Sequence, residues 1–481
     1  MATNSTYDAI VVGAGPNGLS AAITLARAGL SVLVLEAQTS VGGGTRTAEL
    51  TLPGYLHDVC ATVLTTALIS PFMRSLPLEQ YGVEWVQPDI PVSHPLDGGQ
   101  AAHMYRSMDE TAAGLGEDGS AYQRVFAPLM RHSQEIMEEI LGPFPFPPKH
   151  MLALANFGRL GIQPASFLAR HKFHGPVAQA LFGGMGAHSI LPINWLGTAA
   201  FGLVMTMGAH AVGWPIVRGG TQYFANALAA ILSSMGGKVV VGQKVSSLTD
   251  IPPARAVLFD VTPRNFIKIA GESLPSNYCR ALERFRYGPG VCKVDFALSG
   301  PIPWQNPDCA RSGTVHIGGR LEEIEEAEAS VAAGEHPQKP YVLLVQPTVF
   351  DPSRAPEGKH TAWAYCHVPH GSTLDVSERI EAQIERFAPG FRDLVLARHV
   401  YTASEMEAYN PNYVGGDINS GMQDLRQLFT RPVTRWIPYS TPLKGVYLCS
   451  SSTPPGGGVH GMSGYHAARA ALRKVFHMQA V

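Results

Sequence analysis

Residues 7–18 read YDAIVVGAGPNG, an apolar run that leads directly into a glycine-rich turn. The spacing of Gly13, Gly15 and Gly18 is typical of the turn between the first strand and the first helix of a dinucleotide-binding unit. In such a turn the first glycine permits the tight bend, the second lets the backbone approach a pyrophosphate, and the third lets the helix pack closely on the strand. Free N–H groups at the helix N-terminus bind the phosphates. The stretch predicts an α/β fold of the Rossmann type.

The residues after the turn complete this unit. We expect a helix over residues 19–28, with Gly29 at its C-terminal cap, and then a second buried strand over residues 31–35. Glu36 closes that strand, where an acidic side chain hydrogen-bonds the ribose hydroxyls and repels a 2′-phosphate. The combination predicts that the chain binds an adenine dinucleotide.

A second glycine turn, VGGGTR at residues 41–46, follows almost at once. An NAD domain has no need of it, whereas FAD lies extended and its phosphates can meet a second set of backbone donors. Arg46 can add a charge-assisted contact. A plain glycine loop is the alternative. We predict FAD as the cofactor.

Composition bounds the size, partners and compartment of the protein. With 481 residues the chain exceeds the usual size of one domain, so we expect two intertwined domains. A net charge of −2 gives no electrostatic case for binding nucleic acid. The six cysteines show no CxxC and no metal-ligand spacing, which predicts reduced thiols, no bound metal and no disulfide-reductase mechanism. Only six residues precede the first strand, too few for a leader, so we expect a cytoplasmic protein and leave peripheral membrane contact open.

The segment between Lys172 and Arg218 contains no Asp, Glu, Lys or Arg. Pro192, Pro215 and several glycines interrupt it, which argues against a transmembrane helix. One interpretation is a buried helical layer. The other is the wall of an apolar substrate cavity or a membrane-facing entrance. Both can hold.

The rest of the chain alternates between helix-like and strand-like stretches. We expect a helix over residues 120–141 bent at Pro128, and a second one after Thr221 as its N-cap. Short strands are expected at residues 238–241, 244–248, 256–261, 291–298, 341–349, 361–368 and 446–449. We therefore assign residues 1–90, 215–290 and 430–481 to a cofactor domain, and residues 91–214 and 291–429 to a substrate domain. In the latter, residues 120–214 form the helical, apolar part and residues 291–370 the sheet.

The last strand, residues 446–449, runs into SSSTPPGGGVHGMSGYH at residues 450–466, followed by a helix through Phe476. Strand, glycine turn and helix recur here, but the spacing is not GxGxxG. Such a turn can bring main-chain N–H groups against a ring system, and a helix N-terminus beside it would stabilise the negative charge of reduced flavin. A helix docked through a glycine turn is the alternative.

These motifs carry a family resemblance. The motifs are the fingerprint with Glu36, the glycine turn after it, GPGVCKVDFAL (288–298), FDVTPRNF (259–266), GGDINSGMQDLRQLFTRPV (415–433) and YLCSSSTPPGGGVHGMSGYHAARAAL (447–472). Together they resemble the phytoene desaturase-related FAD oxidoreductases, in particular their phytoene dehydrogenase-like branch. The resemblance spans almost the whole chain. It implies a glutathione-reductase-type FAD domain interleaved with a substrate domain of mixed sheet plus helical cover.

The resemblance also implies site residues. Val245 would meet the adenine, and the 457–462 turn would line the flavin. Many flavoproteins carry Gly-Asp after the last strand, where this chain has Cys449 and Ser450, so Ser450 would replace the acid on the ribityl group. The predicted cofactor-binding residues are Gly13, Gly15, Pro16, Asn17, Gly18, Glu36, Ala37, Gly43, Gly44, Thr45, Arg46, Val245, Ser450, Gly457, Gly458, Val459 and Met462.

Few residues are candidates for proton transfer beside a flavin. His57 and Asp58 follow the cofactor-binding start, and His460 lies in the C-terminal turn. We name these three as catalytic candidates, while His188 stands in the charge-free segment. For each, a packed or backbone-bonded side chain is the alternative.

The expected function is an FAD-dependent dehydrogenase, desaturase or oxidase that removes hydride from an apolar, isoprenoid-like or long-chain substrate. A flavin amine oxidase, a flavin-dependent isomerase and a flavin-binding interaction protein without turnover stay open as alternatives. No second GxGxxG follows a strand, so we expect O₂, a quinone or another bound acceptor to reoxidise the flavin.

Overall fold

The strand that precedes the first glycine turn is the centre of a parallel sheet. The computed structural model describes residues 7–143 and 147–479. In it β1 (Tyr7–Val12) pairs with β2 (Val32–Leu35) on one side and β10 (Ala254–Phe259) on the other. The sheet has five strands in the order β16-β10-β1-β2-β9, with β9 at Lys238–Val240 and β16 at Val446–Leu448. Every pairing is parallel, so the carboxyl ends of β1, β10 and β16 meet at one edge.

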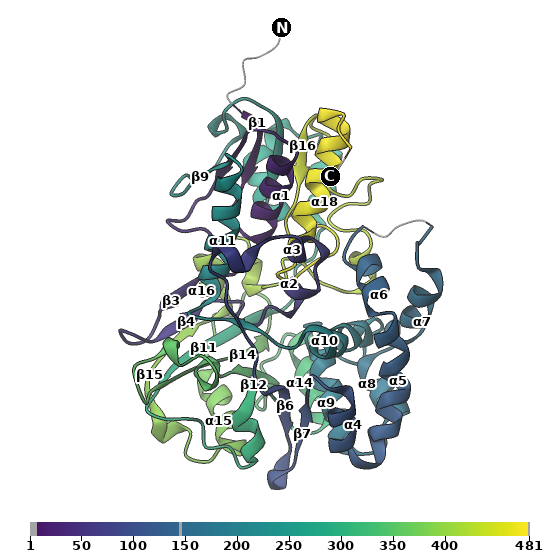
Figure 1. The fold of residues 1–481 in the computed structure, drawn as a ribbon, viewed down its shortest axis with the longest axis vertical. Helices are drawn as coiled ribbons and strands as arrows, with labels where there is room; N and C mark the ends of the chain where they lie inside the picture. Colours follow the sequence, from purple (N-terminus) through teal and green to yellow (C-terminus); the bar gives the residue numbers. More distant parts are fainter. Residues whose placement is uncertain (1–6, 144–146, 480–481) are drawn as a thin grey trace.

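Helices cover both faces of this sheet, which is why its strands are apolar throughout. On one face α1 (Pro16–Arg27) packs against α11 (Thr221–Ser234) and α18 (Met462–Ala471), so the two ends of the chain lie side by side (Figure 1). On the other face the rings of Phe259 and Phe266 join β10 to α12 (Pro263–Ala270), and α13 (Ser276–Glu283) completes that layer.

A second sheet lies below the first in Figure 1. Its seven strands are arranged as β15-β11-β14-β13-β12-β6-β7, antiparallel except where β12 pairs with β6. Their bounds are β6 (Ile90–Pro95), β7 (Ala101–Met104), β11 (Gly290–Leu298), β12 (Ser312–Ile317), β13 (Val342–Val345), β14 (His360–Val368) and β15 (Val395–Tyr401).

The two faces of the second sheet have different neighbours because side chains alternate along a strand. Val315 of β12 and Leu344 of β13 point to a core that includes α15 (Ser377–Phe387). Thr314 and Leu343, on the opposite face, line the cavity described below.

The charge-free segment forms α9 (Pro176–Ala187), α10 (Thr198–Val212) and the chain between them. Both helices pack on each other and belong to a bundle beside the second sheet (Figure 1). The bundle also contains α5 (Gly119–Arg131), α6 (Ser133–Ile140), α7 (Met151–Gly161) and α8 (Ala165–Lys172). The interpretation as a buried helical layer is confirmed for α9 and α10, whereas residues 194–196 between them are exposed. No helix in the described part of the chain is long and apolar enough to cross a membrane.

Several sequence expectations were wrong in detail. The helix over residues 120–141 continues through Pro128 and breaks at His132, between α5 and α6. Residues 244–248 form no strand, because the N–H groups of Ser246 and Ser247 bind the Asp250 carboxylate instead of a neighbouring strand. Thr221 is the first residue of α11 rather than its cap.

The α/β class is confirmed, with a Rossmann-type sheet and a mixed sheet plus helices. The boundaries of the two domains stay a prediction, which the interleaved order of the strands supports. The six residues on which the expectation about a leader rests lie outside the described residues.

Candidate functional site

One continuous cavity of about 690 Å³ lies between the two sheets. The glycine turns at the carboxyl edge of the parallel sheet line one end, which we call the cofactor end. The second sheet and the charge-free helices line the other, which we call the substrate end. A cavity at the carboxyl ends of parallel strands is the usual ligand position in such sheets.

Two glycine turns meet backbone to backbone at the cofactor end. Gly13 has φ of +103°, and a Cβ on Gly18 would lie 2.1 Å from the Gly13 carbonyl oxygen. A Cβ on Gly43 would lie 3.1 Å from the Cα of Gly15. The cap residue Gly15 offers no side chain to the first N–H groups of α1. The resulting cradle of backbone donors fits a diphosphate.

Glu36 is held in place at the end of β2. One carboxylate oxygen accepts from the Ala14 N–H (2.7 Å), and the other from the Gln38 N–H (2.9 Å) and from Arg46 Nη2 (3.2 Å). The side chain lines the cavity beside Val245. This position suits an acid that binds ribose hydroxyls.

Arg46 binds Glu36 and the Ser40 carbonyl oxygen, so its charge is partly used within the protein. Its Nε and the Oδ1 of Asn17 are buried polar atoms without a partner, and both residues line the cavity. Buried polar groups are normally paired, so these two fit a site completed by a polar ligand such as FAD.

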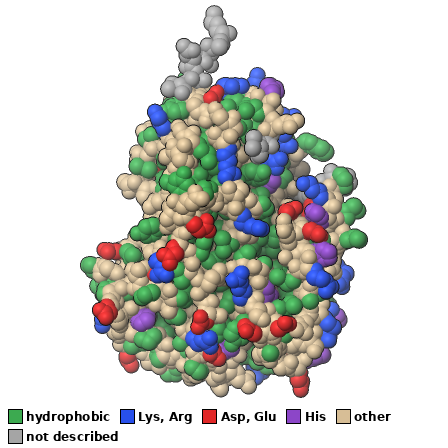
Figure 2. All heavy atoms as spheres, in the orientation of Figure 1, with side chains coloured by type: hydrophobic (Ala, Val, Ile, Leu, Met, Phe, Trp, Pro, Cys, Tyr) green, Lys and Arg blue, Asp and Glu red, His purple; other side chains and the backbone are tan. Residues whose placement is uncertain are grey.

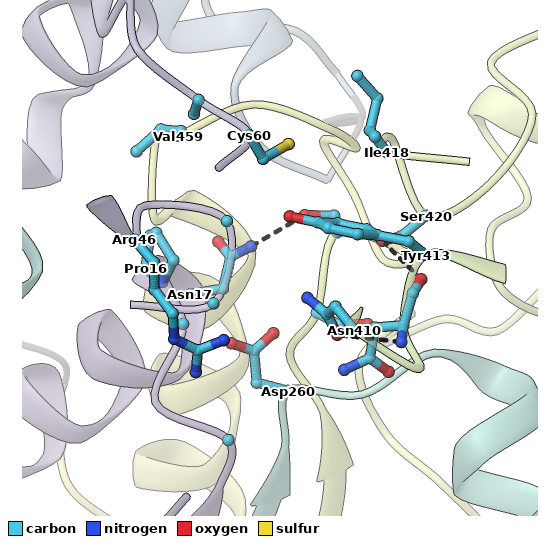
Figure 3. A pocket seen from close by; sticks show the side chains of 18 of the residues that line it. Pro16, Asn17, Arg46, Cys60, Asp260, Asn410, Tyr413, Ile418, Ser420 and Val459 are labelled. Atoms are coloured by element: carbon cyan, nitrogen blue, oxygen red, sulfur yellow. Dashed lines mark hydrogen bonds between the residues drawn. The ribbon is translucent and has the colours of Figure 1, made fainter. Parts of the chain in front are cut away.

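Asp260 is a site residue that the sequence motifs did not single out. It follows β10, and its Oδ2 accepts the Gly18 N–H at 2.8 Å, on the first turn of α1. Burial, with a smaller contribution from the nearby Glu36 carboxylate, raises the pKa of Asp260 to about 7. Figure 3 shows it between Arg46 and Asn410 on the cavity wall. The sequence could have indicated Asp260, because an acidic residue at the carboxyl end of the strand beside β1 lies at the same sheet edge as the first glycine turn.

The C-terminal glycine turn closes the cofactor end from the other side. Arg431 is fully buried behind it and donates to the Ser451 carbonyl oxygen at 2.9 Å. Gly456 has a φ of +120°, which favours glycine, and a Cβ there would lie 2.9 Å from an Arg431 nitrogen. Ser450 donates to the Val261 carbonyl oxygen (2.8 Å) and thereby joins β16 to β10.

Most of the predicted cofactor residues line the cavity, and some lie behind its wall. Those on the wall are Gly13, Gly15, Pro16, Asn17, Glu36, Ala37, Gly43, Gly44, Arg46, Val245, Ser450, Gly458 and Val459. Gly18, Thr45, Gly457 and Met462 are not on it. Their contact with the cofactor, like that of the residues on the wall, stays a prediction.

The substrate end is apolar and uncharged. Its described wall consists mainly of Val63, Met205, Trp214, Leu343, Val345, Trp363, Tyr365 and Ile418. The two indole N–H groups are satisfied by threonines: Trp363 donates to Thr62 Oγ1 and Trp214 to Thr314 Oγ1, each at 2.8 Å. Every charged side chain on the described wall, namely Glu36, Arg46, Lys244, Asp260 and Lys268, comes from the segments that build the cofactor end.

The three catalytic candidates are all buried away from this wall. Asp58 is fully buried and binds Arg354 (3.1 Å), Thr47 and Thr221. Burial alone would raise the pKa of Asp58, but the Arg354 charge and these hydrogen bonds together hold it below its usual value. The geometry shows that Asp58 joins the start of α11 to the turn that contains Arg354.

His57 and His460 are both buried and hydrogen-bonded to neighbouring residues. His57 shares a hydrogen bond with Thr51 (2.8 Å), and burial lowers its pKa to about 3. His460 accepts the Met462 N–H (3.0 Å), and burial lowers its pKa to about 4. Neither is on the cavity wall, and a catalytic role for His57, Asp58 or His460 stays a prediction.

Comparisons with known proteins agree with this architecture. Residues 11–76 match the family model described as an NAD(P)-binding Rossmann-like domain. The chain is 25% identical to pyridine nucleotide-disulfide oxidoreductase domain-containing protein 2 of Mus musculus, over 98% of this chain and 94% of that protein. It is 23% identical to a limonene dehydrogenase polypeptide of Castellaniella defragrans (96% and 94% covered) and 22% identical to a lycopene-forming phytoene desaturase of a Paracoccus species (95% of each).

Two solved structures share the fold over nearly the whole chain. An oxidoreductase from Methanosarcina mazei superposes with a TM-score of 0.64 at 17% identity, covering 97% of this chain and 100% of the other. Cyclohexylamine oxidase from Brevibacterium oxydans superposes with a TM-score of 0.61 at 16% identity, covering 98% and 99%.

Fold, dinucleotide cradle and relatives define an FAD-dependent oxidoreductase. More narrowly, the chain is similar over at least 95% of its length to a phytoene desaturase and to a limonene dehydrogenase polypeptide, in line with the sequence resemblance.

Proposed function

We propose that this protein is a dehydrogenase, desaturase or oxidase that takes hydride from an uncharged, apolar substrate of isoprenoid-like or long-chain type. The observation that carries the proposal is the continuous cavity, charged at the cofactor end and without a charged side chain on the described wall of the substrate end. An ionised substrate would be left there without a counter-ion, at a cost of several kcal/mol.

The residues at the cofactor end fit FAD. The Gly13–Gly18 and Gly43–Gly44 turns would hold the diphosphate, Glu36 the ribose, and the 457–459 turn the ring system. When bound, FAD supplies a hydride acceptor at N5. The chain's own task is to orient the substrate against that position and to exclude water, for which the tryptophan and leucine wall is suited.

The wall also argues against an amine oxidase. An alkylammonium substrate is bound by carboxylates or over aromatic faces; Trp363 and Tyr365 offer such faces, but no Asp or Glu stands on the described wall outside the cofactor end to neutralise the charge. Two relatives are named for terpenes, limonene and phytoene, which are uncharged hydrocarbons. Both observations favour an apolar substrate.

Anaerobic mixing tests the proposal directly. The purified yellow protein would be mixed with limonene, squalene, oleyl alcohol and, as a cationic control, putrescine, while flavin absorbance is followed. We expect at least one of the three uncharged compounds to bleach the flavin and putrescine to leave it oxidised. Bleaching by putrescine alone would overturn the substrate class. Subsequent admission of O₂ or a soluble quinone identifies the acceptor.

We also propose a cytoplasmic protein that touches a membrane surface through the helical bundle. Exposed apolar side chains gather on segments of this layer: Leu152 (88% exposed), Phe167 (55%) and Leu196 (61%). Figure 2 shows apolar side chains, in green, exposed on one face of the molecule. Flotation with neutral phosphatidylcholine vesicles tests this: Leu152→Ser combined with Leu196→Ser should reduce the floated fraction, and unchanged flotation would contradict it.

A further inference from the structure

One partly buried histidine lines the wall of the substrate end, and two fully buried histidines lie behind it. His188 is the C-cap of α9 and lines the cavity itself, where it is the only His, Lys or Arg on the described wall of that end. His316 of β12 lies directly behind it, and His94 of β6 lies behind His316. Both inner histidines are fully buried.

Hydrogen bonds connect these rings in a defined order. The Nε2 atoms of His188 and His316 are 3.1 Å apart, so one carries a proton and the other accepts it. His94 Nε2 donates to the Gly319 carbonyl oxygen at 2.8 Å. The remaining nitrogens, Nδ1 of His94 and Nδ1 of His316, are buried without a partner, and each lies 2.9 Å from the point that a Cβ on Gly184 would occupy. They therefore face the same gap.

This arrangement selects one set of tautomers. Because His94 uses its proton on Nε2, its Nδ1 is a bare lone pair. A proton on His316 Nδ1 avoids a second lone pair in the same gap, and it leaves His316 Nε2 as an acceptor. His188 must then donate from Nε2, so its Nδ1 is unprotonated. His188 lines the cavity, and its Nδ1, the nitrogen not used toward His316, is thus an unprotonated base.

The surroundings keep this base neutral until a proton arrives. Burial lowers the pKa of His188 and of His94 to about 4, and that of His316 well below its usual value. The other titratable groups near the three rings are His367 and Tyr341 from the second sheet and Glu323 of α14 (Leu321–Ala332), which faces His94. Once protonated, His188 is stabilised by the partial negative charge at the end of α9.

We propose that Nδ1 of His188 is the proton acceptor of the reaction, with His316 as the residue that sets its tautomer. The inference rests on the proposed function. As hydride leaves one substrate carbon with both bonding electrons and reduces FAD, the neighbouring atom loses its hydrogen as a proton to His188 Nδ1. The electron pair of that second bond forms the new double bond, so the substrate is oxidised by two electrons.

The tautomers can be read without any substrate. Nitrogen-15 NMR of histidine-labelled, FAD-loaded protein should show His188 protonated at Nε2 only and His316 at Nδ1 only, with His316→Asn removing the preference at His188. A proton on His188 Nδ1 would overturn the inference whatever the substrate proves to be.

Variants then test the proton transfer. His188→Gln should load FAD as the wild type does but bleach it about 10²- to 10⁴-fold more slowly with limonene, squalene or oleyl alcohol, the usual range for loss of a general base. His171→Gln, on the exposed face of α8, is the matched control and should bleach at the wild-type rate. In His188→Ala, added imidazole should restore bleaching in proportion to its concentration, which a merely structural role would not produce.

The outcomes separate the two proposals. Equal rates for wild type and His188→Gln, or no effect of imidazole on His188→Ala, would overturn the role of His188 and leave the proposed function intact. No bleaching of the wild type by the uncharged compounds would overturn the proposed function and this role with it.

Discussion

The cofactor end of the cavity is built from backbone and charge, whereas the substrate end is built from apolar side chains. At the first, two glycine turns touch main chain to main chain and Glu36, Arg46 and Asp260 surround them. At the second, the wall residues come from the paired strands β13 and β14 and from segments far from them in the chain. Backbone sites depend on a few glycines close together in sequence, while a side-chain cavity depends on tertiary packing. The two ends should therefore respond differently to substitution.

The largest effect is expected at Gly15. Its φ of −74° suits any residue, so glycine is needed there for space and not for conformation. A Cβ would lie 2.8 Å from Asp260 Oδ2 and close the approach of a diphosphate. Gly15→Val should weaken FAD binding more than about 100-fold, roughly 3 kcal/mol, and yield colourless protein. Absorbance at the flavin band measures the loading.

Gly158→Val is the matched control, because a Cβ on this glycine of α7 meets nothing within 4 Å. It should purify yellow. A Gly15→Val protein fully loaded with FAD would show that the fingerprint does not hold the diphosphate. The cofactor end would then not depend on its glycines as proposed.

At the substrate end the sharpest change is a charge. Leu343 is 5% exposed and lines the apolar wall, so Leu343→Asp places an unpaired carboxylate against the substrate. FAD loading should persist, while bleaching by the uncharged compounds slows about 100-fold, roughly 3 kcal/mol. Leu343→Met keeps the volume and should stay near the wild-type rate. Loss of FAD from Leu343→Asp would show that the two ends are not separable.

The same contrast explains what could be predicted from the sequence. Strand β1, the turn after it and Glu36 were predictable, because their spacing within about 30 residues is dictated by one turn and one ligand. The C-terminal turn was readable for the same reason. Strand β7 was missed because it has only four residues, and β6 because it contains two prolines and its partner β12 is more than 200 residues away in the chain.

The substrate wall could be predicted only as apolar. The charge-free segment marked α9 and α10 as buried, but nothing local tells that His188 meets His316 of β12. Conversely, His57 and Asp58 were candidates because they are titratable and adjacent in the sequence. Only the fold shows that His57 hydrogen-bonds Thr51 and that Asp58 pairs with Arg354. Roles that depend on long-range pairing leave no signature in spacing.

An intermediate effect is expected at Glu36. Its carboxylate accepts from Ala14, Gln38 and Arg46 and would also bind ribose. Glu36→Ala removes those acceptors and should weaken FAD binding by about 1–3 kcal/mol, which raises the dissociation constant about 5- to 150-fold. Glu36→Gln, which keeps the shape and part of the hydrogen bonding, should fall between. Titration of apoprotein with FAD measures all three, and an unchanged constant for Glu36→Ala would remove Glu36 from the site.

The smallest effect at neutral pH, and the one that best probes the charge of the cofactor end, concerns Asp260. Its pKa in the folded protein is raised to about 7, above the value of 3.8 for an exposed Asp, so its contribution to stability is complete below pH 3.8 and is lost as the pH rises to about 7. A bound diphosphate adds negative charge beside it and favours the protonated form further. FAD binding should therefore take up a proton, and the dissociation constant should rise by up to about tenfold per pH unit above pH 7.

Asp260→Asn, which keeps a carbonyl oxygen for the Gly18 N–H, should flatten this pH dependence, whereas the exposed Asp393→Asn should leave it unchanged. Equal pH profiles for wild type and Asp260→Asn between pH 6 and 9 would show that Asp260 carries no proton linked to the cofactor.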